Sequence, residues 1–142
     1  MALKLNIIGE RIATGYDETT GEFGFLRYYW NARHGDLLKG LGVQLADVVN
    51  EPDDINIYVD ETYITAGVTA QDILDGQWGW VWISNSRCQA MAADGVTTND
   101  LVTFDKNTGY VVTLSTWDSS CKGRMIEGGS SSLCLMELKF YL

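Results

Sequence analysis

Proline and histidine are nearly absent from this sequence, whereas glycine is abundant. Pro52 is the one proline and His34 the one histidine among 142 residues, while 15 glycines are spread along the chain. Glycine supplies the positive φ of tight hairpin loops, so its frequency favours many short strands over long helices. A single histidine leaves few ways to build a catalytic triad or a transition-metal site.

Long apolar runs and basic clusters are also missing. No stretch approaches the roughly 20 uncharged apolar residues that cross a bilayer, and residues 1–11 lack the apolar core of a secretory signal. Ten Lys and Arg stand against 19 Asp and Glu, which gives a formal net charge of −9 at pH 7. Such a chain repels phosphate backbones and anionic lipid surfaces. We therefore expect no nucleic-acid partner and no membrane partner.

Cysteine is scarce and irregularly spaced. Cys88, Cys121 and Cys134 are an odd number of thiols without C-x-x-C spacing, which argues against a disulfide framework and a zinc site. A chain of this length buries about 68% of its unfolded surface, so it needs neither a metal nor a disulfide to fold. We predict three free, buried thiols in a protein made in a reducing cytoplasm. Cys121 and Cys134 are the pair nearest in sequence and form the alternative, a single bridge.

Catalytic and nucleotide-binding motifs are absent. The sequence contains no G-x-S-x-G, no Walker A motif and no G-x-G-x-x-G. A hydrolase would therefore have to use His34 or Cys88. The acidic pairs at 53–54 and 60–61 offer oxygen ligands, but the EF-hand spacing is missing. We expect no enzymatic activity, no cofactor and no metal.

Short apolar segments between turn dipeptides predict an all-β chain. The clearest hairpin turns are Asp94-Gly95 and residues 107–109, Asn-Thr-Gly. In the last strand, Glu137 and Lys139 share one face while Leu138 and Phe140 share the other, so one face of that strand should be exposed to solvent. The expected strands are Leu3–Ile7, Phe23–Trp30, Ile55–Val59, Gln77–Ser84, Arg87–Ala92, Leu101–Asp105, Tyr110–Ser115 and Leu133–Tyr141.

Two segments predict short helices. Leu37–Val49 is the best helical candidate by length, but Gly40 and Gly42 disfavour a helix there and leave Gly42–Val49 as the predicted helix. Thr69–Gly76 begins with an N-cap residue and ends with a closing glycine. Residues 14–22 resemble a polar loop and residues 51–54 a turn. No repeat of about 20 to 50 residues is visible.

These elements predict a compact antiparallel β-sandwich or barrel with one or two short helices and an extended N-terminal arm. We assign residues 1–36 to the arm and its aromatic segment, and residues 37–142 to a single β domain.

Aromatic residues gather at 23–30 (FGFLRYYW) and 78–82 (WGWVW). Alternate residues of a strand face the same way, so the three tryptophans of the second segment would stand in a row about 6.6 Å apart. Such a row forms the core of a barrel, a protein interface or a stacking platform for sugars. The interface candidates are Phe23, Phe25, Tyr28, Tyr29, Trp30, Trp78, Trp80 and Trp82.

The order of motifs in the second half carries a resemblance. The tryptophan segment is followed by residues 88–92 (CQAMA), 94–102 (DGVTTNDLV) and 106–111 (KNTGYV), and then by 123–127 (GRMIE) and 131–138 (SSLCLMEL). From Gly76 to Leu138 this order resembles the small capsid decoration, or cement, proteins and related virion proteins of tailed phages. The last two segments resemble their penultimate and final strands, whereas the first 75 residues match no family.

The resemblance implies a non-enzymatic structural protein, often a homotrimer, on the outer face of an icosahedral phage capsid. Its partners would be the major capsid protein and copies of itself. It would be made in the host cytoplasm and would stabilise the shell from the virion surface. The segment 2–30 is our choice for an arm that bridges capsid subunits, because its aromatics can anchor once docked.

Two alternatives stay open at this point. One is a carbohydrate-binding or adhesion β module that uses the tryptophan row. The other is a small hydrolase that uses Cys88 or His34.

Overall fold

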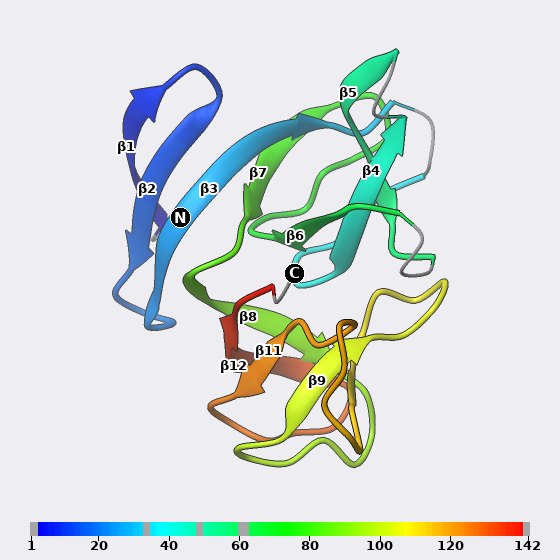
Figure 1. Cartoon of the computed structure of the whole chain (residues 1–142). Helices are drawn as coiled ribbons and strands as arrows, with labels where there is room; N and C mark the ends of the chain where they lie inside the picture. The colour runs from blue at the N-terminus through cyan, green and yellow to red at the C-terminus, as the bar shows by residue number, and fades with distance from the viewer. Residues whose placement is uncertain (1–2, 33–34, 48–49, 60–62, 141–142) are drawn as a thin grey trace.

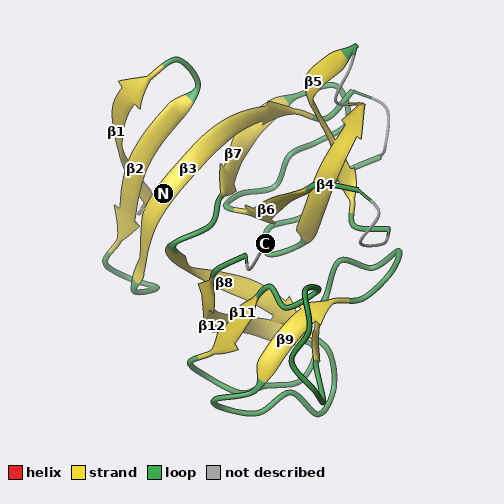
Figure 2. Ribbon diagram, viewed as in Figure 1, coloured by secondary structure: helices red, strands yellow, loops and turns green. Residues whose placement is uncertain are grey.

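The computed structural model describes residues 3–32, 35–47, 50–59 and 63–140, which form strands joined by turns (Figures 1 and 2). The all-β prediction is confirmed. None of the residues in these ranges is helical, so the expectation of one or two short helices is wrong. The strands are β1 (Leu3–Gly9), β2 (Ile12–Asp17), β3 (Glu22–Trp30), β4 (Gly42–Asp47), β5 (Glu51–Ile57), β6 (Thr65–Thr69), β7 (Trp78–Trp82), β8 (Ser86–Ala92), β9 (Leu101–Phe104), β10 (Val111–Thr113), β11 (Gly123–Met125) and β12 (Ser132–Leu138).

Ten of these strands close into two rings of five. In the first ring, β3 pairs with β5 and β7, and β4 and β6 complete the circle between them. In the second ring, β8 pairs with β10 and β12, and β9 and β11 complete the circle. The first ring lies above the second in Figure 1. The pairings are antiparallel except for β3–β5 and β8–β10, which are parallel.

The second ring repeats the pairing order and the register of the first. Val43 on β4 pairs with Gly67 on β6, and Val102 on β9 pairs with Gly123 on β11. Both valines are completely buried. Both glycines lie so close to the next strand that a Cβ would overlap a carbonyl oxygen, that of Trp82 for Gly67 and that of Glu137 for Gly123. The two rings are therefore built on one plan.

Isolated bridges outside the strands follow the same plan. Leu37 bridges Ile73 beside the first ring, and Val96 bridges Gly129 beside the second. Each ring is longer than the repeats considered in the sequence, and the counterparts mostly differ in residue type. The duplication is consequently visible in the hydrogen bonding and not in the sequence pattern.

Two apolar clusters fill the rings. The smaller one lies inside the first ring and includes Val43, Ile55 and Val81. The larger one fills the second ring and continues between the rings, where Leu26 and Trp82 of the first ring join it. The larger cluster therefore joins residues of the first ring to the core of the second.

The N-terminal residues form a hairpin and not a loose arm. β1 pairs along β2, and β2 pairs along β3, which then runs on into the first ring (Figure 1). The polar loop expected at residues 14–22 is therefore partly wrong, because it contains the end of β2 and only the turn at 18–21. The division into residues 1–36 and 37–142 stays a prediction, although β3 belongs to both the hairpin and the ring.

Neither expected helix forms: one segment is a strand, and the other is the end of a strand followed by bends, a bridge and a turn. Gly42–Asp47 is strand β4, because it finds backbone partners on both sides, and residues 48–49 lie outside the described ranges. Thr69 ends β6, and its hydroxyl accepts a hydrogen bond from the Leu41 amide and donates one to the Leu38 carbonyl instead of capping a helix. Pro52 lies within β5 with its ring exposed, so the turn expected at 51–54 is also extended.

Candidate interaction surface

Four aromatic side chains form a ladder across two strands of the first ring. Trp30 lies opposite Trp78, and Tyr28 lies opposite Trp80. Ring centroids are 6.2 Å apart for Trp30 and Trp78, and 4.8 Å apart for Tyr28 and Trp80. All four are half-buried. We call this set the aromatic ladder. Its rings stack mainly on one another, which stabilises the β3–β7 pair.

Two of the candidate aromatics are core residues. Trp82 shares a face with Trp78 and Trp80, as expected, but it is completely buried between the two rings. Its indole N–H finds no hydrogen-bond partner among the described residues. Tyr29 points into the first ring and is 7% exposed, and burial raises the pKa of its phenol. Neither side chain is available to a ligand or to a partner protein.

Exposed aromatics lie instead on the sheet formed by β1, β2 and β3, which we call the hairpin sheet. Phe23 and Phe25 of β3 are 53% and 42% exposed, and Tyr16 of β2 beside them is 47% exposed. They border an open hollow of about 510 Å³. The Arg87 guanidinium lies 5.3 Å from the Phe23 ring centroid, and the Lys4 ammonium lies 5.5 Å from that of Tyr16. We call Tyr16, Phe23 and Phe25 the aromatic shelf.

The shelf and the ladder are separate sites on one strand. β3 leaves the hairpin and enters the first ring, so the face that is open at Phe23 becomes interior at Tyr29. Sequence reasoning missed Tyr16, because residues 14–22 were interpreted as a loop. The signal lay in the alternation of Ile12–Asp17, where Ala13 and Gly15 are buried while Tyr16 is exposed.

The tip of the hairpin is fixed to the first ring by an arginine. The Arg11 carbonyl accepts a hydrogen bond from the Tyr28 backbone amide at 2.8 Å, and the Arg11 guanidinium stacks 4.9 Å from the Trp78 ring centroid. Arg11 and Arg27 both form ion pairs with Asp53. The Asp53 carboxylate, considered above as a calcium ligand, is therefore engaged by two cations, and Arg11 covers part of the ladder.

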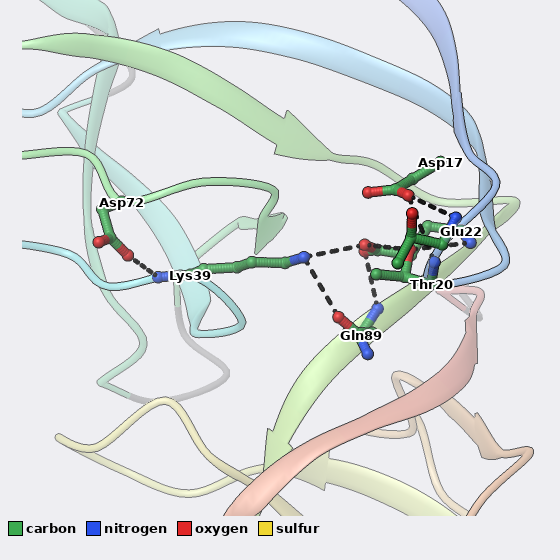
Figure 3. A network of polar contacts seen from close by, with 7 residues as sticks. Asp17, Thr20, Glu22, Lys39, Asp72 and Gln89 are labelled. Atoms are coloured by element: carbon green, nitrogen blue, oxygen red, sulfur yellow. Dashed lines mark hydrogen bonds and ion pairs between the residues drawn. The ribbon is translucent and has the colours of Figure 1, made fainter. Parts of the chain in front are cut away.

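A buried carboxylate joins the hairpin to both rings (Figure 3). Glu22 is 3% exposed. Its carboxylate accepts hydrogen bonds from the Thr20 hydroxyl at 2.8 Å, the Lys39 ammonium at 3.0 Å and the Gln89 backbone amide at 2.9 Å. The Lys39 backbone amide is held in turn by Asp72 at 2.8 Å. A buried charge with this many partners fixes the orientation of the elements that supply them.

Groups suited to catalysis are few in the described part of the chain. His34 lies outside the described residues. Cys88 is completely buried, and burial together with the nearby Glu22 carboxylate raises the pKa of its thiol well above the usual range, so it stays protonated. All three cysteines are free and buried, as predicted. The described ranges contain no cluster of metal-binding side chains and no helix long and apolar enough to cross a membrane.

Comparison with protein-family models and with curated proteins finds no match. Comparison with solved structures gives a likeness to the crystal structure of the head fiber gp8.5 N base in bacteriophage phi29. The TM-score is 0.58 at 19% sequence identity, and the match covers 82% of this chain and 98% of the phage protein. The expected resemblance to phage virion proteins is confirmed at the level of the fold: this chain has the fold of a phage head-fiber base.

Proposed function

We propose that this protein is a non-enzymatic virion structural protein that binds the outer face of a phage capsid and stabilises the shell. The observation that carries the proposal is the fold shared with the phi29 head-fiber base over 82% of the chain. The buried Cys88 thiol also argues against the hydrolase alternative. The proposed partners are the major capsid protein and further copies of the chain in a homotrimer, and the proposed location is the capsid surface after synthesis in the host cytoplasm.

The hairpin sheet is the proposed contact with the capsid. It exposes Ile7 and Ile8 at 60% and 52%, in addition to the aromatic shelf. Exposed aromatics beside cations are typical of binding hot spots. The aromatic shelf has Lys4 and Arg87 packed against its rings, although the net charge of the whole chain is −9. This hairpin is the part of the chain for which we expected a bridging arm.

Stabilisation of a shell follows from mass action. A protein that binds the assembled shell but not free subunits adds RT ln(1 + [L]/Kd) per site, which is about 2.7 kcal/mol at a hundredfold excess over Kd. Because the sites repeat over the shell, a modest affinity at each site suffices to resist the pressure of packaged DNA.

Co-sedimentation with empty shells of its own phage tests the proposal. We expect the full chain to sediment with shells, and the double variant Phe23→Ser, Phe25→Ser to bind at least about 30-fold more weakly, since loss of a hot spot costs about 2 kcal/mol or more. Leu74→Ser, which changes an exposed leucine in the connection between β6 and β7, is the matched control and should bind normally. A full chain that does not bind shells would refute the proposal.

A truncation tests the arm. Deleting residues 2–16 removes β1 and most of β2, whereas β3 keeps its partners in the two rings. We expect a folded protein with weakened shell binding. Unchanged binding would show that the arm assignment is wrong.

A carbohydrate-binding module is the second candidate function. Trp78 and Trp80 are half-buried and so keep part of their ring surface accessible, although Arg11 covers Trp78 in part. A sugar-dependent change in tryptophan fluorescence that Trp80→Ala abolishes, in a chain that ignores shells, would favour this function.

A further inference from the structure

The end of the second ring is closed by the first ring. Phe104, the last residue of β9, is 3% exposed. The ring of Tyr58 packs edge-on against it with centroids 5.5 Å apart, and a Cβ on Gly42 would lie against its aromatic atoms. The start of β4 and the residue after β5 therefore form a cap on the core of the second ring.

Backbone hydrogen bonds fix this cap. The Gly42 amide donates to the Gly109 carbonyl at 2.8 Å, and the Asn107 amide donates to the Tyr58 carbonyl at 2.9 Å. The turn between β9 and β10 thus fits between the two capping residues of the first ring. The contact joins two different surfaces: the start of β4 and the residue after β5 on the first ring, and the β9–β10 turn on the second.

Because the rings share one register, each residue of this contact has a counterpart. Gly42 pairs with Val68 as Leu101 pairs with Arg124. The Tyr58 amide donates to Gly42 as the Leu114 amide donates to Leu101. Leu45 pairs with Ile55 as Phe104 pairs with Val111. The counterparts of Gly42, Tyr58 and Phe104 are therefore Leu101, Leu114 and Leu45.

The members of the in-chain contact are buried, whereas their counterparts are partly exposed. Leu101, Leu114 and Leu45 are each half-buried. Beside Leu45, whose amide donates to the Ile64 carbonyl, Tyr63 and Ile64 are 47% and 59% exposed. One chain thus carries an unused cap on the second ring and an open core end on the first.

A contact that joins two different surfaces is head-to-tail, and it leaves one surface of each kind free at the ends of the pair. Further copies of the same unit extend such a contact, either around a closed ring or along an open filament. We propose that Leu101 and Leu114 of one copy cap the first ring of a second copy at Leu45. The inference rests on the homo-oligomer of the proposed function and names its interface.

The sizes of the side chains agree with this proposed contact. Within the chain, a large residue lies over the smallest one, Phe104 over Gly42. Between chains, two residues of equal size would meet, Leu101 and Leu45. The paired side chains then fill a comparable space in both contacts, as the packing of one repeated interface requires.

Cysteine cross-linking tests the contact directly. Full-length Leu101→Cys and Leu45→Cys proteins are prepared separately, mixed and oxidised mildly; the native thiols are buried. We expect a disulfide-linked pair in the mixture and none in either protein alone, since the two positions lie on different surfaces. Leu101→Cys mixed with Leu74→Cys, at an exposed leucine in the connection between β6 and β7, should not cross-link. No cross-link in the first mixture, or equal cross-linking in the control mixture, would overturn the inference.

The double variant Leu45→Cys, Leu101→Cys measures the number of copies in the assembly. Under non-reducing conditions it should give linked species up to the size of the closed assembly, with no cross-linked product when the two substitutions are combined with Leu114→Glu. Cross-linking by a chain that binds no shells would refute the proposed function alone. Shell binding by a chain that never cross-links would refute this inference alone.

Discussion

The buried pair of Glu22 and Lys39 should make a measurable contribution to folding, because it ties the hairpin to both rings. The Glu22 side chain is 2% exposed and that of Lys39 26% exposed, with 3.0 Å between ammonium and carboxylate. Removing one partner of a fully buried pair costs about 3–5 kcal/mol, because the other charge stays buried without compensation. Since Lys39 is partly solvated, we expect Lys39→Met to lower the free energy of unfolding by about 2–3 kcal/mol.

A double-mutant cycle separates the pair from its surroundings. Glu22→Gln loses the charge, keeps one oxygen that can accept from the Gln89 backbone amide and gains an NH2 group that can donate to the Thr20 hydroxyl, so it relieves the penalty of Lys39→Met. We expect the double variant to be less destabilised than the sum of the single variants, with a coupling energy of about 1–2 kcal/mol.

The measurement is urea unfolding at one fixed protein concentration, followed by circular dichroism. The exposed pair of Lys4 and Glu18, 3.4 Å apart with 61% and 73% of the side chains exposed, is the control. Lys4→Met should change the stability by less than about 0.5 kcal/mol. A coupling energy between Glu22 and Lys39 below about 0.5 kcal/mol would refute the reasoning.

Three further predictions concern the rings. Trp82→Ala removes a completely buried indole between the rings and should cost about 3–5 kcal/mol in urea unfolding; a smaller loss than for an exposed aromatic would contradict its role as core. Gly123→Ala places a Cβ against the Glu137 carbonyl and should cost about 1–3 kcal/mol by thermal unfolding, so unchanged stability would speak against the close approach of β11 and β12. Hydrogen bonds from the Thr97 amide and the Thr113 hydroxyl lower the pKa of Asp100 below its usual 3.8, so their stabilisation is present above that pH and is lost as the pH falls through the lowered value. Asp100→Asn should therefore unfold with a weaker dependence on pH in the acid range, and parallel curves for both proteins would show that the linkage is absent.

Local rules determined much of the second half of the chain from sequence alone. Turns occur at Asp94-Gly95 and Asn107–Gly109 as predicted, with positive φ at Gly95, Asn107 and Gly109. Only the second closes a hairpin, because β9 pairs with β10, whereas β8 pairs with β3, β10 and β12. β8, β9, β10 and β12 lie within a residue or a few of their expected bounds, because alternating apolar residues and turn glycines act over short distances.

The last strand illustrates how far the local pattern reaches. Glu137 is exposed and Leu138 is buried, as the alternation of charged and apolar residues requires. The same alternation placed Trp78, Trp80 and Trp82 on one face of a strand, which the structure bears out. It did not distinguish the half-buried Trp78 and Trp80 from the fully buried Trp82.

Only the tertiary structure decided the rest. Gly42–Asp47 is a strand because β5 and β6 offer backbone partners on both sides, and Trp82 is core because the second ring packs against that end of β7. The closure of two rings on one plan, the burial of Glu22 beside Lys39 and the unused cap at Leu101 depend on residues far apart in sequence. Pairing between distant strands depends on which surfaces come together when the chain folds. A local pattern of residue types does not specify those long-range contacts.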